Sequence, residues 1–339
     1  MRLLHLLPHT WTQPDGEPYA IYWSDTWGLG RLYPVPSASQ LDALYATPEY
    51  TDYAVHGPGH GGHGRAPKRV SIAERALFRL ARLRNDGHDL DASHLEALVH
   101  DLDRKGRFCD VGCGPALLLA SLRERGHEVL GIEPSPIARA SAAEHGVRVL
   151  DGTAEHLPDD APRDHFDVVT MVQSLEHCSD VLLAIRNAAL LLRPGGTMVC
   201  EVPNHESLGF AQKGPAWFHT DAGRHIHFFS DRSLRRATEL AGLSHVRTEY
   251  AGYSRQYAWL PAEREVWDRL YGAESAGAPA AAPSNGGERR EHRDGTKRPS
   301  SVPPPRPTVG RQWRLLARTL AGPEGRAYDS VRVYAQKPR

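Results

Sequence analysis

The sequence predicts an α/β fold built on a doubly wound, mostly parallel β-sheet. Apolar runs of strand length recur along the chain, at 107–111, 128–133, 147–150, 166–172 and 197–202. Segments with apolar residues at i, i+3 and i+4 separate these runs, at 117–125, 137–145 and 182–192. Near-continuous apolar strands that alternate with amphipathic helices are typical of a parallel sheet covered on both faces.

Further elements lie around and after the fifth of these runs. Residues 193–196, Arg-Pro-Gly-Gly, predict the turn that leads into the fifth strand. We expect a helix at 234–241, ending at Gly242, and then a sixth strand at 246–250. Residues 330–336 alternate in a way that is typical of a last strand.

Composition narrows the class of protein. The 339 residues carry 41 basic and 41 acidic side chains, so nothing indicates a nucleic-acid partner. The N-terminal apolar run is too short and interrupted for a signal peptide, and no stretch approaches a membrane span. The four cysteines form no Cys-x-x-Cys pair and favour a reducing, cytoplasmic setting. The sequence leaves the oligomeric state open.

We divide the chain into an N-terminal extension, 1–67, and a main domain, 68–339. Aromatic residues and glycines at 17–35 predict a small β-hairpin or ribbon. Residues 56–63 hold three histidines among glycines and read as a mobile loop, with a metal site or a lid as alternatives. Within 68–105, two capping boxes predict helices that cover the sheet edge and the mouth of a ligand site.

A second irregular stretch precedes the last strand. Residues 273–310 are dominated by Pro, Ala, Ser, Gly, Arg and Glu and have almost no large apolar side chains. Such a segment cannot bury enough surface to offset its chain entropy, so we expect a disordered insertion. Helices are expected on either side of it, at 260–271 and 312–320.

The most informative stretch is 107–116, Arg-Phe-Cys-Asp-Val-Gly-Cys-Gly-Pro-Ala, where a buried strand meets a glycine turn. Gly112, Cys113 and Gly114 allow the backbone to turn tightly and approach a ligand, and the next helix offers unpaired N–H groups. Glu133 ends the following strand, where a carboxylate accepts hydrogen bonds from ribose hydroxyls. The layout indicates an adenosine ligand; the alternative is a turn without a ligand.

Two ligand classes use this layout. A dinucleotide fingerprint requires Gly or Ala where this chain has Leu117. Instead, Asp110-x-Gly112-x-Gly114 resembles motif I of the class I S-adenosylmethionine-dependent methyltransferases, in which the acid orders the loop near the methionine amino group. The family often has a third glycine where this chain has Ala116, which is small enough to be tolerated. The resemblance implies a Rossmann-like seven-stranded sheet whose antiparallel last strand lies between strands five and six.

The resemblance also implies the rest of the cofactor site. Pro134, directly after Glu133, is assigned to the same site. Thr153 and Ala154 match the segment that lies along the adenine, although family members often have an acid at the position of Thr153; an ordinary loop is the alternative. Gln173 leaves the carboxyl end of the fourth strand and should face the methionine part of S-adenosyl-L-methionine.

The resemblance suggests two catalytic histidines. The pair Glu176-His177 is similar to that of the quinone-biosynthesis O-methyltransferases, so His177 is our first candidate for a general base. Its alternative is a structural role at a helix entry, and Glu176 is interpreted as a cap or supporting group. The segment around Trp217 and His225 resembles a loop that roofs the acceptor pocket, with His225 as the second candidate base. Alternatively, this loop is only tied to the sheet.

The N-terminal ribbon resembles one that binds zinc in some methyltransferases of this type. Ser24 and Trp27 occupy places where cysteines are expected, so we predict an aromatic ribbon without metal, and no metal site elsewhere. The function indicated is S-adenosylmethionine-dependent methylation of a small organic acceptor, with O-methylation favoured over C- or N-methylation. A nucleotide-dependent oxidoreductase and a non-catalytic cofactor-binding scaffold are the alternatives.

Overall fold

The computed structural model describes most of the predicted sheet and its flanking helices. The residues it describes are 1–7, 19–45, 72–81, 83, 90–99, 105–253, 257 and 308–339. The histidine loop at 56–63, the expected helix at 260–271 and all but the end of the expected insertion at 273–310 lie outside these residues.

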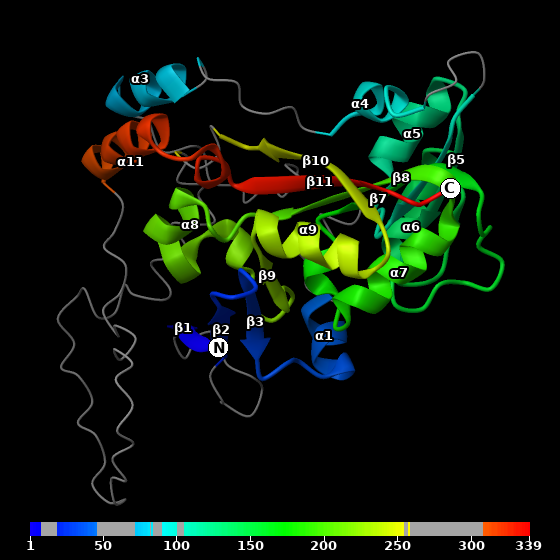
Figure 1. Ribbon diagram of the computed structural model, residues 1–339, viewed down its shortest axis with the longest axis horizontal. Helices are drawn as coiled ribbons and strands as arrows, with labels where there is room; N and C mark the ends of the chain where they lie inside the picture. Colours follow the sequence, from blue (N-terminus) through cyan, green and yellow to red (C-terminus); the bar gives the residue numbers. More distant parts are fainter. Residues whose placement is uncertain are drawn as a thin grey trace, which may run out of the picture.

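A seven-stranded sheet forms the centre of the main domain (Figure 1). Its order is β10-β11-β8-β7-β4-β5-β6, and β11 runs antiparallel between β8 and β10. This confirms the fold class, including the antiparallel last strand between strands five and six. The strand bounds are β4 Arg107–Val111, β5 Glu128–Ile132, β6 Val149–Leu150, β7 Phe166–Val172, β8 Leu192–Pro203, β10 Ser244–Ala251 and β11 Ser330–Gln336.

Helices cover both faces of the sheet. On one face, Ala184 and Ile185 of α7 and Leu234 of α9 share a core with alternate residues of the central strands. On the other, buried side chains of α4, α5 and α6 pack against Phe108 and Val168. The helix bounds are α4 Ala92–Glu96, α5 Leu117–Glu124, α6 Pro136–Glu144, α7 Val181–Leu191 and α9 Asp231–Leu240. The alternation in the sequence therefore predicted the layers correctly.

Three boundaries differ from the sequence prediction. The expected turn at Arg193–Gly196 lies inside β8, where the pairing with β7 shifts between Phe166 and Val168 and the intervening residues bulge out. Helix α4 is capped by Asp91, whose side chain accepts from the His94 N–H, whereas the second capping box of the sequence, at 93–96, lies inside the helix. Helix α9 begins three residues early because Ser230 and Ser233 form a reciprocal capping box.

The N-terminal residues form a second, four-stranded sheet. Strands β2 (Ala20–Ser24) and β3 (Leu29–Tyr33) make the expected hairpin, and β1 (Arg2–Leu6) pairs antiparallel with β2. The fourth strand, β9 (His227–Phe229), comes from the main domain and pairs with β3. The ribbon is thus built into the loop after β8, where Figure 1 shows β3 beside β9. Helix α1 (Ala38–Tyr45) follows it.

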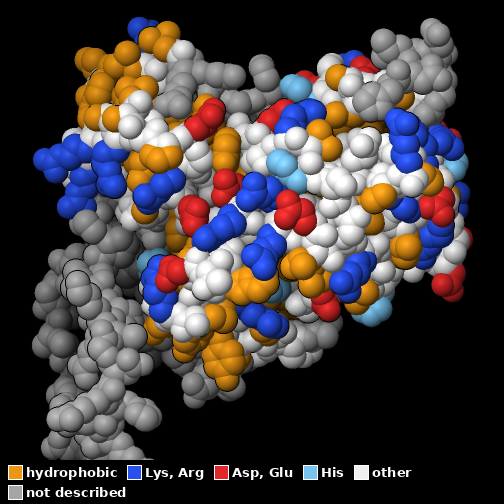
Figure 2. Space-filling view, viewed as in Figure 1, with side chains coloured by type: hydrophobic (Ala, Val, Ile, Leu, Met, Phe, Trp, Pro, Cys, Tyr) orange, Lys and Arg blue, Asp and Glu red, His pale blue; other side chains and the backbone are white. Residues whose placement is uncertain are grey.

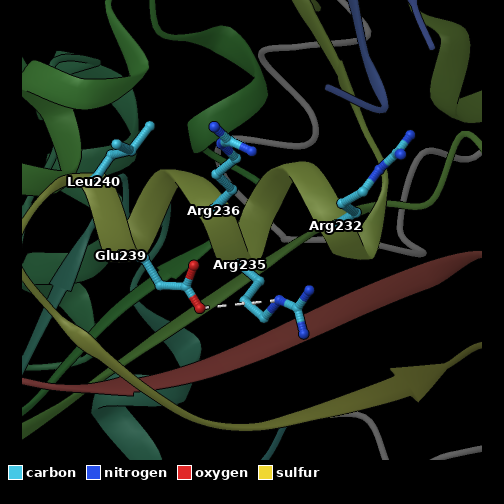
Figure 3. Close-up of a pocket in the computed structure, with 5 residues that line it drawn as sticks. All are labelled: Arg232, Arg235, Arg236, Glu239 and Leu240. Carbon is cyan, nitrogen blue, oxygen red and sulfur yellow. Dashed lines mark ion pairs between the residues drawn. The ribbon is translucent and has the colours of Figure 1, made fainter. Parts of the chain in front are cut away.

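A surface hollow on α9 is lined by side chains that contact the ribbon (Figure 3). Arg232 donates to the backbone oxygen of Asp25 over 2.6 Å, and the guanidinium of Arg236 lies 4.2 Å from the ring of Trp27. Arg235 points the other way, toward Glu239 at 4.0 Å. Two of the arginines that line the hollow therefore hold the ribbon in place.

The remaining helices lie at one end of the molecule. Helix α3 (Ile72–Ala81) packs Leu77 and Ala81 against α11 (Val309–Ala321), which confirms the helix expected at 312–320. The helical spacing of the sequence predicts Leu80 and Leu83 on the same buried face, but both are exposed. Figure 2 shows apolar side chains gathered at this end of the molecule. That α3 and α4 close a ligand site stays a prediction. Helix α8 (Leu208–Lys213) follows β8.

Within the described residues, no helix is both long and apolar enough to pass through a lipid bilayer.

Candidate functional site

The glycine turn after β4 has the conformation that its sequence requires. Gly112 and Gly114 adopt φ values of +80° and +52°, which residues other than glycine rarely adopt. A Cβ at Gly112 would lie 2.6 Å from the Cβ of Ser174, whereas one at Gly114 would meet none of the described residues within 4 Å. Gly112 is thus needed to pack against the loop after β7, while open space beside Gly114 lets a ligand approach the backbone.

Glu133 lies directly against this turn. One carboxylate oxygen accepts the N–H of Gly114 over 3.0 Å, and the other accepts the N–H of Ser135 over 2.9 Å. Burial raises the pKa of Glu133, and these two hydrogen bonds oppose the rise. Each oxygen keeps a further lone pair, so the carboxylate can also accept hydroxyl hydrogens. The predicted coupling between acid and turn is therefore present in the fold.

Asp110 is buried beneath the same turn. Its carboxylate accepts the hydroxyl hydrogen of Thr170 from the adjacent strand β7 over 2.6 Å. Burial raises the pKa of Asp110 to about 7; the Thr170 hydrogen bond lowers it, and the charge of Glu133 adds to the rise. No local pattern predicts Thr170 as a partner, because the two residues meet only when β4 and β7 pair.

The other residues of the turn, and Pro134 beside it, are held by packing and backbone contacts. The Cys113 sulfur packs against Gly131 of β5, where an added Cβ would lie 2.5 Å away, so this side chain belongs to the core. Ala116 adopts φ = +56° at the start of α5, in the left-handed region. Pro134 continues from Glu133, and its carbonyl accepts from Arg139 over 2.7 Å.

The predicted adenine segment is held by internal hydrogen bonds. The Thr153 hydroxyl oxygen accepts the N–H of His156 over 3.0 Å, and the carbonyl of Ala154 accepts from the Asn187 side chain over 3.0 Å. The Thr153 side chain therefore stabilises its own turn.

The loop after β7 begins with backbone strain. Gln173 adopts φ = +52°, which is uncommon outside glycine, and its N–H donates to Glu201 of β8 over 2.8 Å. Ser174 then donates to the carbonyl of Val111 over 3.0 Å. These bonds join the loop to the glycine turn, so the residues that follow lie at the same edge of the sheet.

His177 follows within the 3₁₀ turn η1 (Leu175–His177) and lies beside residues from two distant segments. Its Nδ1 is 3.1 Å from the carbonyl oxygen of Arg224 and 3.1 Å from the Tyr45 hydroxyl of α1. A carbonyl can only accept, so the first contact places the ring proton on Nδ1. The ribbon predicted at 17–35 stops short of Tyr45, so the sequence did not predict this contact.

His225 and Glu176 complete a cluster with His177. The two imidazole rings meet edge to face, with centroids 4.7 Å apart. Nδ1 of His225 is 2.9 Å from the carbonyl oxygen of His219, and its Nε2 is 3.9 Å from Oε1 of Glu176. Glu176, interpreted above as a cap, is fully buried, and neither of its oxygens accepts a hydrogen bond from the described residues.

Burial shifts the pKa values of all three groups. It lowers the pKa of His177 to about 3, with repulsion from His225 adding to the effect, and lowers that of His225 to about 4. It raises the pKa of Glu176 to about 8. Both imidazoles are therefore neutral near neutral pH and are weaker bases than a solvent-exposed histidine.

The rest of the expected roof packs inward. Trp217 is buried, with its ring centroid 5.1 Å from that of His205 and 5.4 Å from that of Phe210. His227 donates toward the carbonyl of Cys178 over 3.0 Å. Trp217 and His227 thus pack inside the protein, while His225 faces the cluster. That this loop roofs an acceptor pocket stays a prediction.

Comparison with known proteins places this arrangement in a family. A family model described as a methyltransferase domain matches residues 82–248. The ubiquinone biosynthesis O-methyltransferase of Methylocella silvestris is 32% identical over 205 residues, which cover 57% of this chain and 76% of that protein. The chain belongs to the methyltransferase family.

A second relative covers less of the chain, and a solved structure covers all of it at low identity. The ubiquinone biosynthesis O-methyltransferase of Azorhizobium caulinodans is 38% identical over 156 residues, 44% of this chain and 56% of that relative. The chain thus spans little more than half the length of this curated relative. A Burkholderia thailandensis 1,6-didemethyltoxoflavin-N1-methyltransferase structure has a TM-score of 0.46 at 13% identity and covers 100% of both chains.

The residues of this methyltransferase fit an adenosine-containing ligand. The open space beside Gly114 is a cradle that a side chain would fill, and Glu133 lies at its edge with lone pairs to spare. The turn residues, Glu133 and Gln173 all lie at the carboxyl ends of parallel strands, where such sheets bind ligands.

Proposed function

We propose that this protein transfers a methyl group from S-adenosyl-L-methionine to a hydroxyl group of a small organic acceptor. The observation that carries the proposal is the hydrogen bond from the Gly114 N–H to Glu133, because it joins the acid and the glycine turn into one ligand cradle. When bound, S-adenosyl-L-methionine supplies an activated methyl group on a sulfonium.

The chain's own residues would hold and orient this cofactor. Glu133 is assigned to the ribose hydroxyls, and the backbone at Gly112, Cys113 and Gly114 to the methionine part. Asp110 supports the turn from below through Thr170 and, once ionised, attracts the ammonium group. Pro134, Thr153, Ala154 and Gln173 remain proposed neighbours of the cofactor.

The acceptor is proposed to be a small organic molecule with a hydroxyl group. Relatives at 32% and 38% identity are named as O-methyltransferases of ubiquinone biosynthesis, which favours oxygen as the nucleophile. Balanced charge gives no support for a polyanionic partner. Four unpaired, buried cysteines support a reducing, cytoplasmic setting.

We assign His177 and His225 to the acceptor side of the site. His177 lies beyond Gln173 on the loop that Ser174 joins to the glycine turn, and the ring of His225 meets it from the loop before β9. A neutral imidazole can accept a proton from a hydroxyl, but low pKa values make these two weak general bases. Their contribution is therefore expected to include positioning of the acceptor oxygen.

Calorimetric titration with S-adenosylhomocysteine tests the cofactor site. Glu133→Ala is expected to weaken binding by about 1–3 kcal/mol, as for loss of a hydrogen bond to a charged group. Glu128→Ala is the matched control, because Glu128 lies exposed at the start of the same strand. No binding by the wild type, or thermal protection by NADH alone, would contradict the proposal, as would equal affinities for the two variants.

A further inference from the structure

The cluster of Glu176, His177 and His225 has the composition of a metal site. Each residue offers one ligand atom, and these atoms lie within 4.8 Å of one another. Glu176 and His225 are buried, and His177 is partly buried. The three side chains come from η1 and from the loop that precedes β9, so only the folded chain brings them together.

The carboxylate of Glu176 has no hydrogen-bond partner among the described residues. Both oxygens are buried and accept no hydrogen bond from the part of the chain that the structure describes. A buried carboxylate in this situation is costly unless a cation or a donor faces it. The nearest ring nitrogen, Nε2 of His225, lies 3.9 Å away, beyond hydrogen-bond distance.

Both imidazoles are held in the form that binds metals. Nδ1 of His177 faces the Arg224 carbonyl and Nδ1 of His225 faces the His219 carbonyl, so each ring carries its proton on Nδ1. Each Nε2 then keeps a lone pair. Metal-binding histidines are commonly oriented by such bonds from the second ring nitrogen to a backbone carbonyl.

We propose that Glu176, His177 and His225 bind one divalent first-row transition ion, with Zn²⁺ as the representative. Two imidazole nitrogens and one carboxylate oxygen suit such ions better than Mg²⁺ or Ca²⁺, which prefer oxygen alone. Tetrahedral bonds of about 2.1 Å put ligand atoms roughly 3.4 Å apart, so the ion draws the three side chains closer. Three protein ligands leave a position for a water or a substrate oxygen.

The role of this ion rests on the proposed function. The hydroxyl oxygen of the acceptor takes the open position, and the ion lowers its pKa so that the proton leaves to solvent. The oxygen lone pair then forms the bond to the methyl carbon, and the electrons of the broken carbon–sulfur bond stay on sulfur. The ion thus supplies the activation of the acceptor hydroxyl that the proposed methyl transfer requires.

Titration of the full, tag-free, chelator-treated chain with Zn²⁺ alone tests the site. We expect one ion per chain, and about tenfold or greater loss of affinity in His225→Asn and in Glu176→Gln. Asparagine at 225 retains an N–H donor for the His219 carbonyl but removes Nε2. His227→Asn is the matched control, because this histidine lies in the same loop and faces the Cys178 carbonyl instead.

A second control separates this cluster from the glycine-rich loop. His56, His60 and His63 lie outside the described residues, and their triple alanine variant should retain the Zn²⁺ site. Replacement by Co²⁺ should give visible absorption bands in the wild type that weaken in His225→Asn. Absence of stoichiometric binding, or binding that survives in both His225→Asn and Glu176→Gln, would overturn the proposal.

S-adenosylhomocysteine titrations distinguish failure of the metal site from failure of the proposed function. His225→Asn should bind this ligand like the wild type, because the cluster lies on the acceptor side. Zn²⁺ binding without any S-adenosylhomocysteine binding would keep the metal site and remove its role in methyl transfer. Loss of both ligands in the variant would point to a folding defect and count against a separate site.

Discussion

At the scale of single residues, Asp110 makes stability depend on pH. Its pKa is about 7 in the folded chain and 3.8 when unperturbed, so the folded state binds the proton more tightly. The stability that this preference contributes is present below pH 3.8 and is lost as the pH rises through 7. The free energy of unfolding of the wild type should therefore fall in this window relative to Asp110→Asn, by up to roughly 1.4 kcal/mol per pH unit.

Urea denaturation across this pH range measures the difference between the two proteins. Asparagine has a similar shape but does not ionise, so its curve lacks this contribution. Parallel pH profiles for wild type and variant would mean that Asp110 is ionised in both the folded and the unfolded states.

Ala116 provides a second prediction, because it occupies a conformation that suits glycine. Its φ of +56° costs a residue with a Cβ about 1–2 kcal/mol, part of which the greater chain entropy of unfolded glycine offsets. Ala116→Gly should therefore stabilise the fold by roughly 0.5–1 kcal/mol in chemical denaturation. Ala120→Gly, inside α5, should instead destabilise it by about 1 kcal/mol. The same sign for both would contradict this account.

Which site residues the sequence could reveal depends on how local their partners are. The glycine turn and Glu133 were predictable because a strand, a turn and an acid follow one another in the chain. The contact of Tyr45 with His177 joins residues 132 positions apart, and no local pattern encodes it. Glu176 was interpreted as a cap because its burial depends on β8, β9 and η1 packing together.

At the scale of elements, a buried ion pair links β8 to β11. Glu201 and Arg332 face each other in the strand register, and the Arg332 Nε donates to Glu201 over 2.7 Å. Arg332→Met should cost about 3–5 kcal/mol, because it leaves a buried carboxylate without its partner. Glu201→Met combined with Arg332→Met should recover most of that loss, since an apolar pair replaces both charges.

Guanidinium denaturation of the two single variants and the double variant tests this coupling. Additive losses would show that the two side chains act independently. Glu249 of β10 lies 3.5 Å from the Arg332 guanidinium and is partly exposed. Glu249→Gln should therefore lower the free energy of unfolding less than Arg332→Met does.

Element boundaries were harder to predict than element types. Arg193–Gly196 has the composition of a turn, yet the chain continues in β8 and absorbs the extra residues as a bulge beside Phe166 and Asp167. A Cβ at Gly196 would lie 3.0 Å from the Phe166 carbonyl, so the glycine serves close strand contact. The sequence shows the glycines, but the pairing of the strands determines whether they form a turn or a bulge.

At the scale of the whole molecule, backbone hydrogen bonds link the N-terminal ribbon to the loop that carries His225. The Ile226 N–H donates to the Glu176 carbonyl over 2.8 Å, and the Ile226 carbonyl accepts the N–H of Leu32 in β3 over 2.8 Å. One backbone path thus runs from η1 through the His225 loop to the ribbon. The sequence predicted the hairpin but not β9, because the fourth strand of this sheet lies some two hundred residues further along the chain.

This path predicts that a change in the ribbon alters the metal cluster but not the cofactor cradle. A Cβ at Gly30 would lie 2.9 Å from that of Phe228 in β9 and 3.0 Å from the Trp23 ring, so Gly30→Val should push β3 away from β9. We expect about tenfold weaker Zn²⁺ binding, because the displaced loop misplaces His225, with unchanged S-adenosylhomocysteine affinity. Gly310→Val on α11, where an added Cβ would meet a single described neighbour at 4.0 Å, is the control and should change neither affinity. If Gly30→Val binds Zn²⁺ like the wild type, the ribbon does not position His225; if it loses both ligands, the ribbon supports the fold as a whole.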